Sequence, residues 1–99
     1  MRGLDALLVP TTVMPAAKIG EDTEVELEGK KLPTMPTFTR NANPFNVINY
    51  PAITVPAGYS QAGLPIGLQI VARPWEDAKL LSIAYVFEQA TKVRKAPKL

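Results

Sequence analysis

Few residues in this chain have the chemistry that catalysis needs, and their spacing argues against a complete catalytic site. The chain contains neither histidine nor cysteine, so it lacks the usual general base near neutral pH, a thiol nucleophile and zinc's preferred ligands. Ser60 lies in Gly-Tyr-Ser-Gln-Ala, which misses the Gly-x-Ser-x-Gly nucleophile elbow because position 62 is alanine. That elbow also needs a following helix and a histidine, so we interpret Ser60 as a loop serine.

The charged residues favour contact with solvent over chemistry. Glu24, Glu26 and Glu28 alternate along a predicted strand, and residues two apart on a strand lie about 7 Å from each other. That spacing suits solvation better than a closed oxygen cage around a metal ion. Four lysines fall at predicted loop, turn or helix-surface positions, namely Lys18, Lys30, Lys31 and Lys79. We therefore expect no metal and no other cofactor.

The glycines and the C-terminal cations carry no binding motif. Gly58, Gly63 and Gly67 match neither the dinucleotide-binding nor the phosphate-binding spacing. Gly58 and Gly63 are interpreted as turn residues, and Gly67 as a turn residue or a point where a neighbouring group comes close. The net charge is +2, with cations gathered at the C-terminus in Lys92, Arg94, Lys95 and Lys98. These suit a solvated helix end, so we expect no nucleic-acid partner.

The elements that position these residues predict an α/β fold in a single domain over residues 1–99, because this length supports one core. Leu4 to Pro10 is a short apolar run that we interpret as a strand. Val25 and Leu27 alternate with the glutamates, which predicts a strand with one wet face and a short return strand. Three prolines between Leu32 and Pro44 predict irregular or extended chain.

Asn43 and Pro44 then predict the cap and the first residue of a short helix over about residues 44–49. Two β-branched runs follow, over residues 52–56 and 65–72, separated by turn glycines, and we expect them to pair as antiparallel neighbours. Near-continuous apolarity in the second run implies burial on both faces. Gln69 within it would then need hydrogen-bond partners.

The clearest element is a helix over about residues 77–93, with apolar residues at helical spacing from Leu80 to Phe87. Glu76 is its predicted cap, which would place Trp75 and Leu80 at the positions of a hydrophobic staple. We expect both helices to pack on a fragment of a mixed β-sheet. No apolar run reaches the roughly 20 residues of a membrane-spanning helix, so we expect a cytoplasmic protein without a membrane partner.

The order of these pieces resembles the C-terminal part of the amidase signature family. Members of that family carry a Pro-Phe-Asn helix start, a Pro-Ala-Ile-Ser/Thr-Val-Pro strand, a Gly-Leu-Pro-Ile-Gly-Leu-Gln-Ile strand and a helix that ends Glu-Gln-Ala-Thr. The same series runs here from Phe38 to Thr91. Residues 5–33 look like the preceding strand, loop and hairpin of the allophanate-hydrolase-like and aryl-amidase-like members.

The resemblance implies a hydrolase that cleaves the C–N bond of carboxamides with a Ser–cis-Ser–Lys triad and without histidine. Nothing in this chain matches the Gly-Gly-Ser-Ser-Gly stretch or the catalytic lysine of that family. We therefore expect a C-terminal fragment that is inactive alone and supplies core packing and one wall of the substrate pocket. By the same resemblance, five residues approach the acyl part of the substrate, namely Phe38, Thr39, Arg40, Asn41 and Asn43.

Two further inferences concern substrate and partners. The glutamine-dependent tRNA amidotransferases carry, in their amidase component, an aspartate at the position that aligns with Thr39, so a neutral threonine there favours a stand-alone amidase. A fragment of a larger sheet should expose apolar surface and unpaired strand edges, so we expect self-association or pairing with the missing amidase portion. The alternative is a non-catalytic binding or interaction module that keeps an amidase-like fold.

Overall fold

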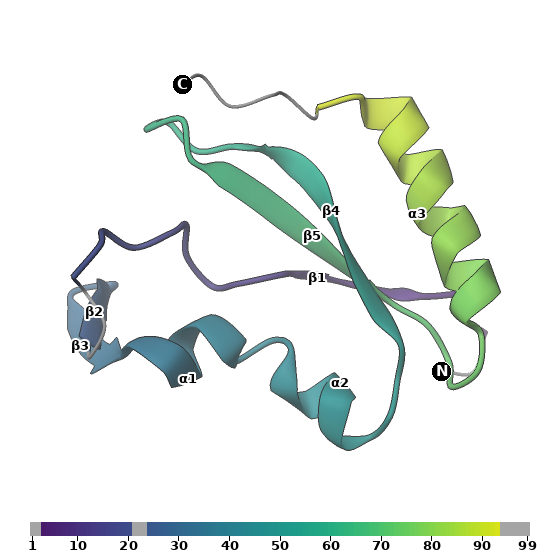
Figure 1. The fold of residues 1–99 in the computed structure, drawn as a ribbon, viewed down its shortest axis with the longest axis horizontal. Coiled ribbons are helices and arrows are strands. Elements are labelled where there is room, and N and C mark those ends of the chain that lie inside the picture. The colour runs from purple at the N-terminus through teal and green to yellow at the C-terminus, as the bar shows by residue number, and fades with distance from the viewer. Residues whose placement is uncertain (1–2, 21–23, 94–99) are drawn as a thin grey trace.

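The computed structural model describes residues 3–20 and 24–93. Its centre is a three-stranded antiparallel sheet in the order β1-β5-β4 (Figure 1). β1 spans Leu7–Pro10, β4 spans Ala52–Tyr59 and β5 spans Pro65–Val71. β5 lies in the middle because its apolar residues alternate onto two covered faces, as its near-continuous apolarity predicts. The predicted antiparallel pairing of the two β-branched runs is confirmed.

The loop between β4 and β5 forms a hairpin with one irregularity. Pro56 pairs with Gly67 and Gly58 with Ile66, so the chain bulges at residue 57. At the tip, Gly63 takes a φ of 84°, which glycine adopts without strain. The Ser60 amide donates to the Leu64 carbonyl at 2.8 Å and closes the turn.

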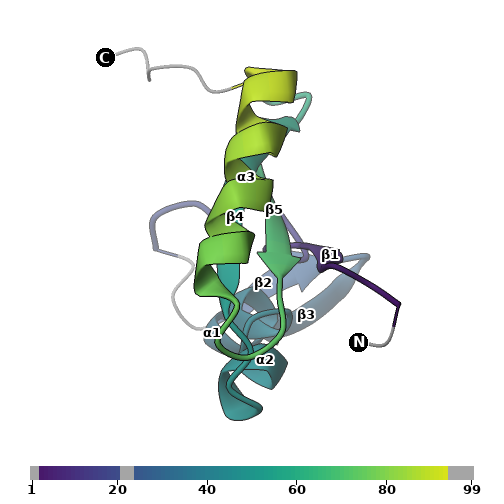
Figure 2. The ribbon, with the colours of Figure 1, turned by 90° about the vertical axis from the view of Figure 1, so that its right-hand side faces the viewer.

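The long C-terminal helix α3 spans Asp77–Thr91 and covers one face of the sheet (Figure 2). It packs mainly on β4 and forms the core of the fold with β5. Five buried residues make up this core, namely Val55, Ile70, Ala72, Leu80 and Ala84. Ile70 is only 1% exposed. The predicted helix therefore exists and ends two residues earlier than expected, at a left-handed Lys92.

The other side of the sheet carries the chain between β1 and β4 (Figures 1 and 2). β2 (Glu24–Leu27) and β3 (Lys30–Pro33) form the predicted antiparallel hairpin, with Val25 buried and the glutamates exposed. Helix α1 (Thr34–Thr39) packs on this hairpin, and the short helix α2 (Asn43–Val47) follows. The α/β fold class is confirmed, and every strand pair in the described part of the chain is antiparallel.

The prediction of irregular chain over residues 32–44 was wrong, because α1 lies within it. Pro36 is the third residue of α1, and the amides of a helix's first turn have no intrahelical partner to lose. The short helix exists as predicted, but it begins at Asn43 and ends at Val47. Its cap position is Ala42, so the predicted side-chain cap by Asn43 is not formed.

The entry into α3 also differs from the expectation. Glu76 does occupy the cap position, but its side chain makes no capping hydrogen bond. Trp75 has a φ of 67° and is 96% exposed, so it does not staple onto Leu80. Of the cations expected to complement the helix dipole, Arg94, Lys95 and Lys98 lie outside the described residues.

Candidate functional site

The five predicted pocket residues lie in the segment that links α1 to α2, and the structure brings two of them into direct contact. The Asn43 amide donates from Nδ2 to the Thr39 hydroxyl at 3.2 Å. The same hydroxyl donates to the Met35 carbonyl at 2.9 Å. Thr39 and Asn43 therefore stabilise the α1–α2 junction, which is the local role that such side chains commonly fill.

Asn41 points the other way and anchors this segment to the sheet. Its Nδ2 donates to the carbonyl of Pro10 at the end of β1, at 2.8 Å. Its backbone carbonyl accepts a hydrogen bond from Gln69 Nε2 at 2.9 Å. Gln69 is only 4% exposed, and this bond meets the demand for a partner that its burial predicts. The linker is thus fixed across the ends of two strands.

Phe38 and Arg40 complete the predicted set. Phe38 is half-buried and Arg40 is exposed. Exposure leaves the Arg40 guanidinium on the outside of the linker, next to a fixed backbone. The structure therefore gathers the five residues in one segment, but it commits Thr39, Asn41 and Asn43 to hydrogen bonds that hold the fold.

A polar face lies on the sheet beneath this linker, on the side opposite α3. It consists of Thr11, Thr54, Gly67 and Gln69, because Thr54 pairs with Gln69 and the Thr11 amide donates to the Gly67 carbonyl. The Thr11 hydroxyl donates to the Thr54 hydroxyl at 3.2 Å. A Cβ on Gly67 would lie 2.8 Å from each threonine side chain. The predicted close approach at Gly67 is therefore confirmed.

Sequence reasoning found Gly67 and Gln69 but missed the two threonines of the polar face. Thr11 and Thr54 lie 43 residues apart. They meet only because β5 lies between β1 and β4. The available signal was the position of Thr54 between Ile53 and Val55, which alternation places on the face away from the core.

Ser60 and the lysines do not form a catalytic pair. The Ser60 hydroxyl accepts the Leu64 amide at 3.1 Å, which ties it to the hairpin turn. Lys79 Nζ donates to the Asp5 carboxylate at 3.0 Å on the surface. This hydrogen bond and the ammonium charge lower the pKa of Asp5. Glu76 completes a small ion network, with its Oε2 3.9 Å from Lys79 and 3.8 Å from Arg73.

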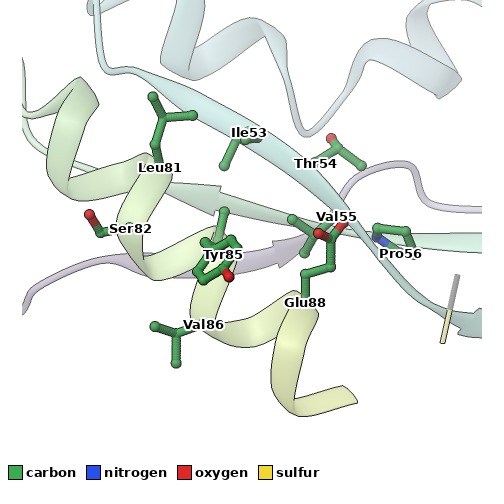
Figure 3. A pocket seen from close by; sticks show the side chains of 10 residues that line it. Ile53, Thr54, Val55, Pro56, Leu81, Ser82, Tyr85, Val86 and Glu88 are labelled. Atoms are coloured by element: carbon green, nitrogen blue, oxygen red, sulfur yellow. The ribbon is translucent and has the colours of Figure 1, made fainter. Parts of the chain in front are cut away.

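Surface hollows lie away from the predicted residues. The first, of about 620 Å³, lies between β4 and α3 (Figure 3). A second, of about 690 Å³, lies between α2 and the loop that enters α3, and a third of about 240 Å³ lies beside Gly67. Among the residues that the structure describes, no group of three or more acidic side chains is placed to hold a metal ion. No helix in that part of the chain is long and apolar enough to cross a membrane.

Comparison with known proteins agrees with the resemblance seen in the sequence. The profile of the Amidase family matches residues 1–81. The amidase-type component of the glutamyl-tRNA(Gln) amidotransferase of Roseobacter denitrificans is 42% identical over 89 residues, which is 90% of this chain and 17% of the relative. A fatty acid amide hydrolase of Medicago truncatula is 38% identical over 86 residues, which is 87% of this chain and 14% of the relative.

The fold itself matches solved amidases. A crystal structure of an amidase superimposes with a TM-score of 0.81 and 35% sequence identity, over 90% of this chain and 20% of the amidase. The chain thus spans about a sixth of the length of the curated relatives. The strands and helices described above are an amidase substructure, and the chain belongs to the amidase family.

Proposed function

We propose that this chain is the C-terminal portion of an amidase that hydrolyses the C–N bond of carboxamides. The observation that carries the proposal is the superposition of 90% of this chain onto one fifth of a solved amidase. The known relatives are several times longer, and the chain's residues offer no nucleophile paired with a base. The Ser–cis-Ser–Lys triad would then lie in sequence that this chain lacks, and the chain alone would be inactive.

In the intact enzyme, the linker between α1 and α2 would form one wall of the substrate pocket. We assign this wall to Phe38, Thr39, Arg40, Asn41 and Asn43. The anchoring of Asn41 to β1 and β5 supports the assignment, because a rigid wall orients a substrate better than a mobile loop. Arg40 and Asn43 remain exposed and have the chemistry to bind an acyl oxygen.

The chain would also associate with the missing amidase portion or with itself. Several large apolar side chains are exposed, including Ile19, Met35, Val47 and Trp75. β4 and β1 are both edge strands of the sheet. Such surfaces are usually covered in a stable protein. A monomer at high concentration in analytical ultracentrifugation would argue against self-association.

The direct test is hydrolysis of a panel of aryl and aliphatic amides by the purified 99-residue chain, scored by release of ammonia or amine. We expect no turnover. Turnover that survives repurification and disappears in Ser60→Ala would overturn the assignment of catalysis to another segment.

The alternative function is a non-catalytic interaction module with an amidase-like fold. The exposed Trp75 beside the hollow at α2 favours a binding surface there, because tryptophan is common at the centres of protein interfaces. An upstream reading frame that encodes a Gly/Ser-rich catalytic stretch would decide for the amidase. A chain that is complete without such a stretch would decide for the module.

A further inference from the structure

The free edge of β4 and the overhanging side of α3 together form one surface. α3 packs mainly on β4, which is the last strand of the sheet on that side. Leu81 and Tyr85 are therefore 61% and 64% exposed, although they are large apolar residues. The groove of about 620 Å³ runs between these residues and Ile53 to Pro56 of β4 (Figure 3). We call this surface the β4 groove.

The backbone of β4 offers hydrogen-bonding groups along this groove. The Ala72 amide donates to the Pro51 carbonyl, so position 51 directs its carbonyl towards β5. Because the bonding direction alternates along an antiparallel strand, positions 53 and 55 also bond to β5. Ala52 and Thr54 then direct their amides and carbonyls away from the sheet. Pro56 stands at the next outward position, where a residue without an N–H leaves the β4–β5 ladder intact.

These groups fit an added strand better than a helix or a small molecule. A strand placed about 4.8 Å beyond β4 would bond to Ala52 and Thr54 and lie under the overhanging residues of α3. Its side chains on the α3 side would need to be apolar to fill the groove beside Leu81 and Tyr85. A strand bonded at two residues before Pro56 would also have a defined end.

A second copy of this chain fits the groove poorly. Pairing of β4 with β4 of the copy would place the two α3 helices about one strand spacing, ~5 Å, apart, because each helix lies over its own β4. Packed helices need about 8–10 Å between their axes. The occupant must therefore bring a strand without a helix on that face.

We propose that the β4 groove receives a β-strand from the remaining portion of the amidase, which bonds to Ala52 and Thr54 and buries Leu81 and Tyr85. This inference rests on the proposed function, because it takes the partner from the four fifths of an amidase that this chain does not span. It adds the position of the junction and the chemistry of the occupant, which is an extended segment with alternate apolar residues.

The test uses a hybrid in which this chain replaces its 86-residue match in the Medicago truncatula fatty acid amide hydrolase. Residue-resolved hydrogen exchange is measured in the hybrid and in the 99-residue chain alone. In the chain alone, the amides of Ala52 and Thr54 should exchange about 100-fold faster than those of Ile53 and Val55, which bond to β5. In the hybrid, all four amides should be protected to a similar degree.

A matched pair of substitutions tests the side-chain part of the groove. Tyr85→Lys and Gln89→Lys each add one positive charge to exposed positions of α3, but only Tyr85 lines the groove. Tyr85→Lys should lower the melting temperature of the hybrid by several degrees, whereas Gln89→Lys should not. In the chain alone, neither substitution should have this effect, because Tyr85 is already solvated there.

The outcomes separate the two proposals. A hybrid that hydrolyses a fatty acid amide but exchanges Ala52 and Thr54 rapidly would overturn the β4 groove and leave the proposed function standing. Equal effects of Tyr85→Lys and Gln89→Lys in an active hybrid would do the same. A hybrid that neither folds nor hydrolyses the amide would count against the proposed function, and the inferred partner would fall with it.

Discussion

Gly67 provides the most direct test of how the sheet is packed. Its φ lies outside the left-handed region, so alanine meets no backbone strain there. A Cβ at this position would lie 2.8 Å from Thr11 Oγ1 and 2.8 Å from Thr54 Cγ2. Ordinary contacts of such atoms begin at about 3.4 Å. Gly67→Ala therefore forces two neighbours to move by several tenths of an ångström.

Those neighbours have little freedom to move. Both are threonines, whose branched Cβ restricts χ1, and their hydroxyls are hydrogen-bonded to each other. Overpacking of this kind costs about 1–3 kcal/mol. Removal of a glycine from a strand returns roughly 0.5–1 kcal/mol. The net loss of unfolding free energy should be about 0.5–2 kcal/mol, which lowers the urea midpoint by about 0.5–1.5 M.

The control removes the two atoms that would clash. Thr11→Ala deletes the Oγ1, and Thr54→Ser deletes the Cγ2 while it keeps the hydroxyl. In that background Gly67→Ala should be neutral or stabilising, which gives a coupling energy of about 1 kcal/mol or more. An unchanged or raised urea midpoint for Gly67→Ala in the wild-type background would refute the crowding argument. So would an equal loss in both backgrounds.

Three other substitutions test separate contacts. Ile70→Ala empties a fully buried core position and should cost about 2–5 kcal/mol in urea unfolding, so a loss below about 1 kcal/mol would contradict the core assignment. Gln69→Ala removes the bond to the Asn41 carbonyl and should cost about 1–3 kcal/mol by the same assay. Lys79→Gln should raise the pKa of Asp5 in an NMR titration, because the hydrogen bond and charge that lower it are lost. A lowered pKa stabilises the fold above the ordinary pKa and ceases to as pH falls through the folded value, so wild type and variant should converge in acid.

The sequence predicts the strands and the last helix well because burial patterns are local. In β5, apolar residues on both faces predict a covered middle strand, and the structure confirms this position. Val25 and its flanking glutamates predict one buried and one wet face in the hairpin, which also holds. These features need only the period of the residues and not the position of distant segments.

Helix α1 escaped prediction because proline content outweighed proline position. Pro36 would break a helix at its centre, but as the third residue of α1 it loses no hydrogen bond. Thr37 and Thr39 then donate to the carbonyls four residues earlier, at Pro33 and Met35. The start of a helix directly after a strand that ends in proline decides the outcome, and composition does not locate that start.

The candidate site could be found from the sequence only through family resemblance. No period or charge pattern marks residues 38–43, and three of the five predicted side chains hold the linker together. The polar face could not be predicted either, because Thr11 and Thr54 come together through the registers of three strands. Such registers are set by the whole sheet.

The register of β5 links the core to the candidate pocket wall. Ile70 faces α3, and its neighbour Gln69 faces the linker and donates to the Asn41 carbonyl. A slip of one residue would place the amide of Gln69 in the apolar core and an isoleucine against the Asn41 carbonyl. Both faces then lose stability together, so the core and the linker specify the same register. Packing of α3 on the sheet therefore also fixes where residues 38–43 lie, although the helix lies on the opposite face.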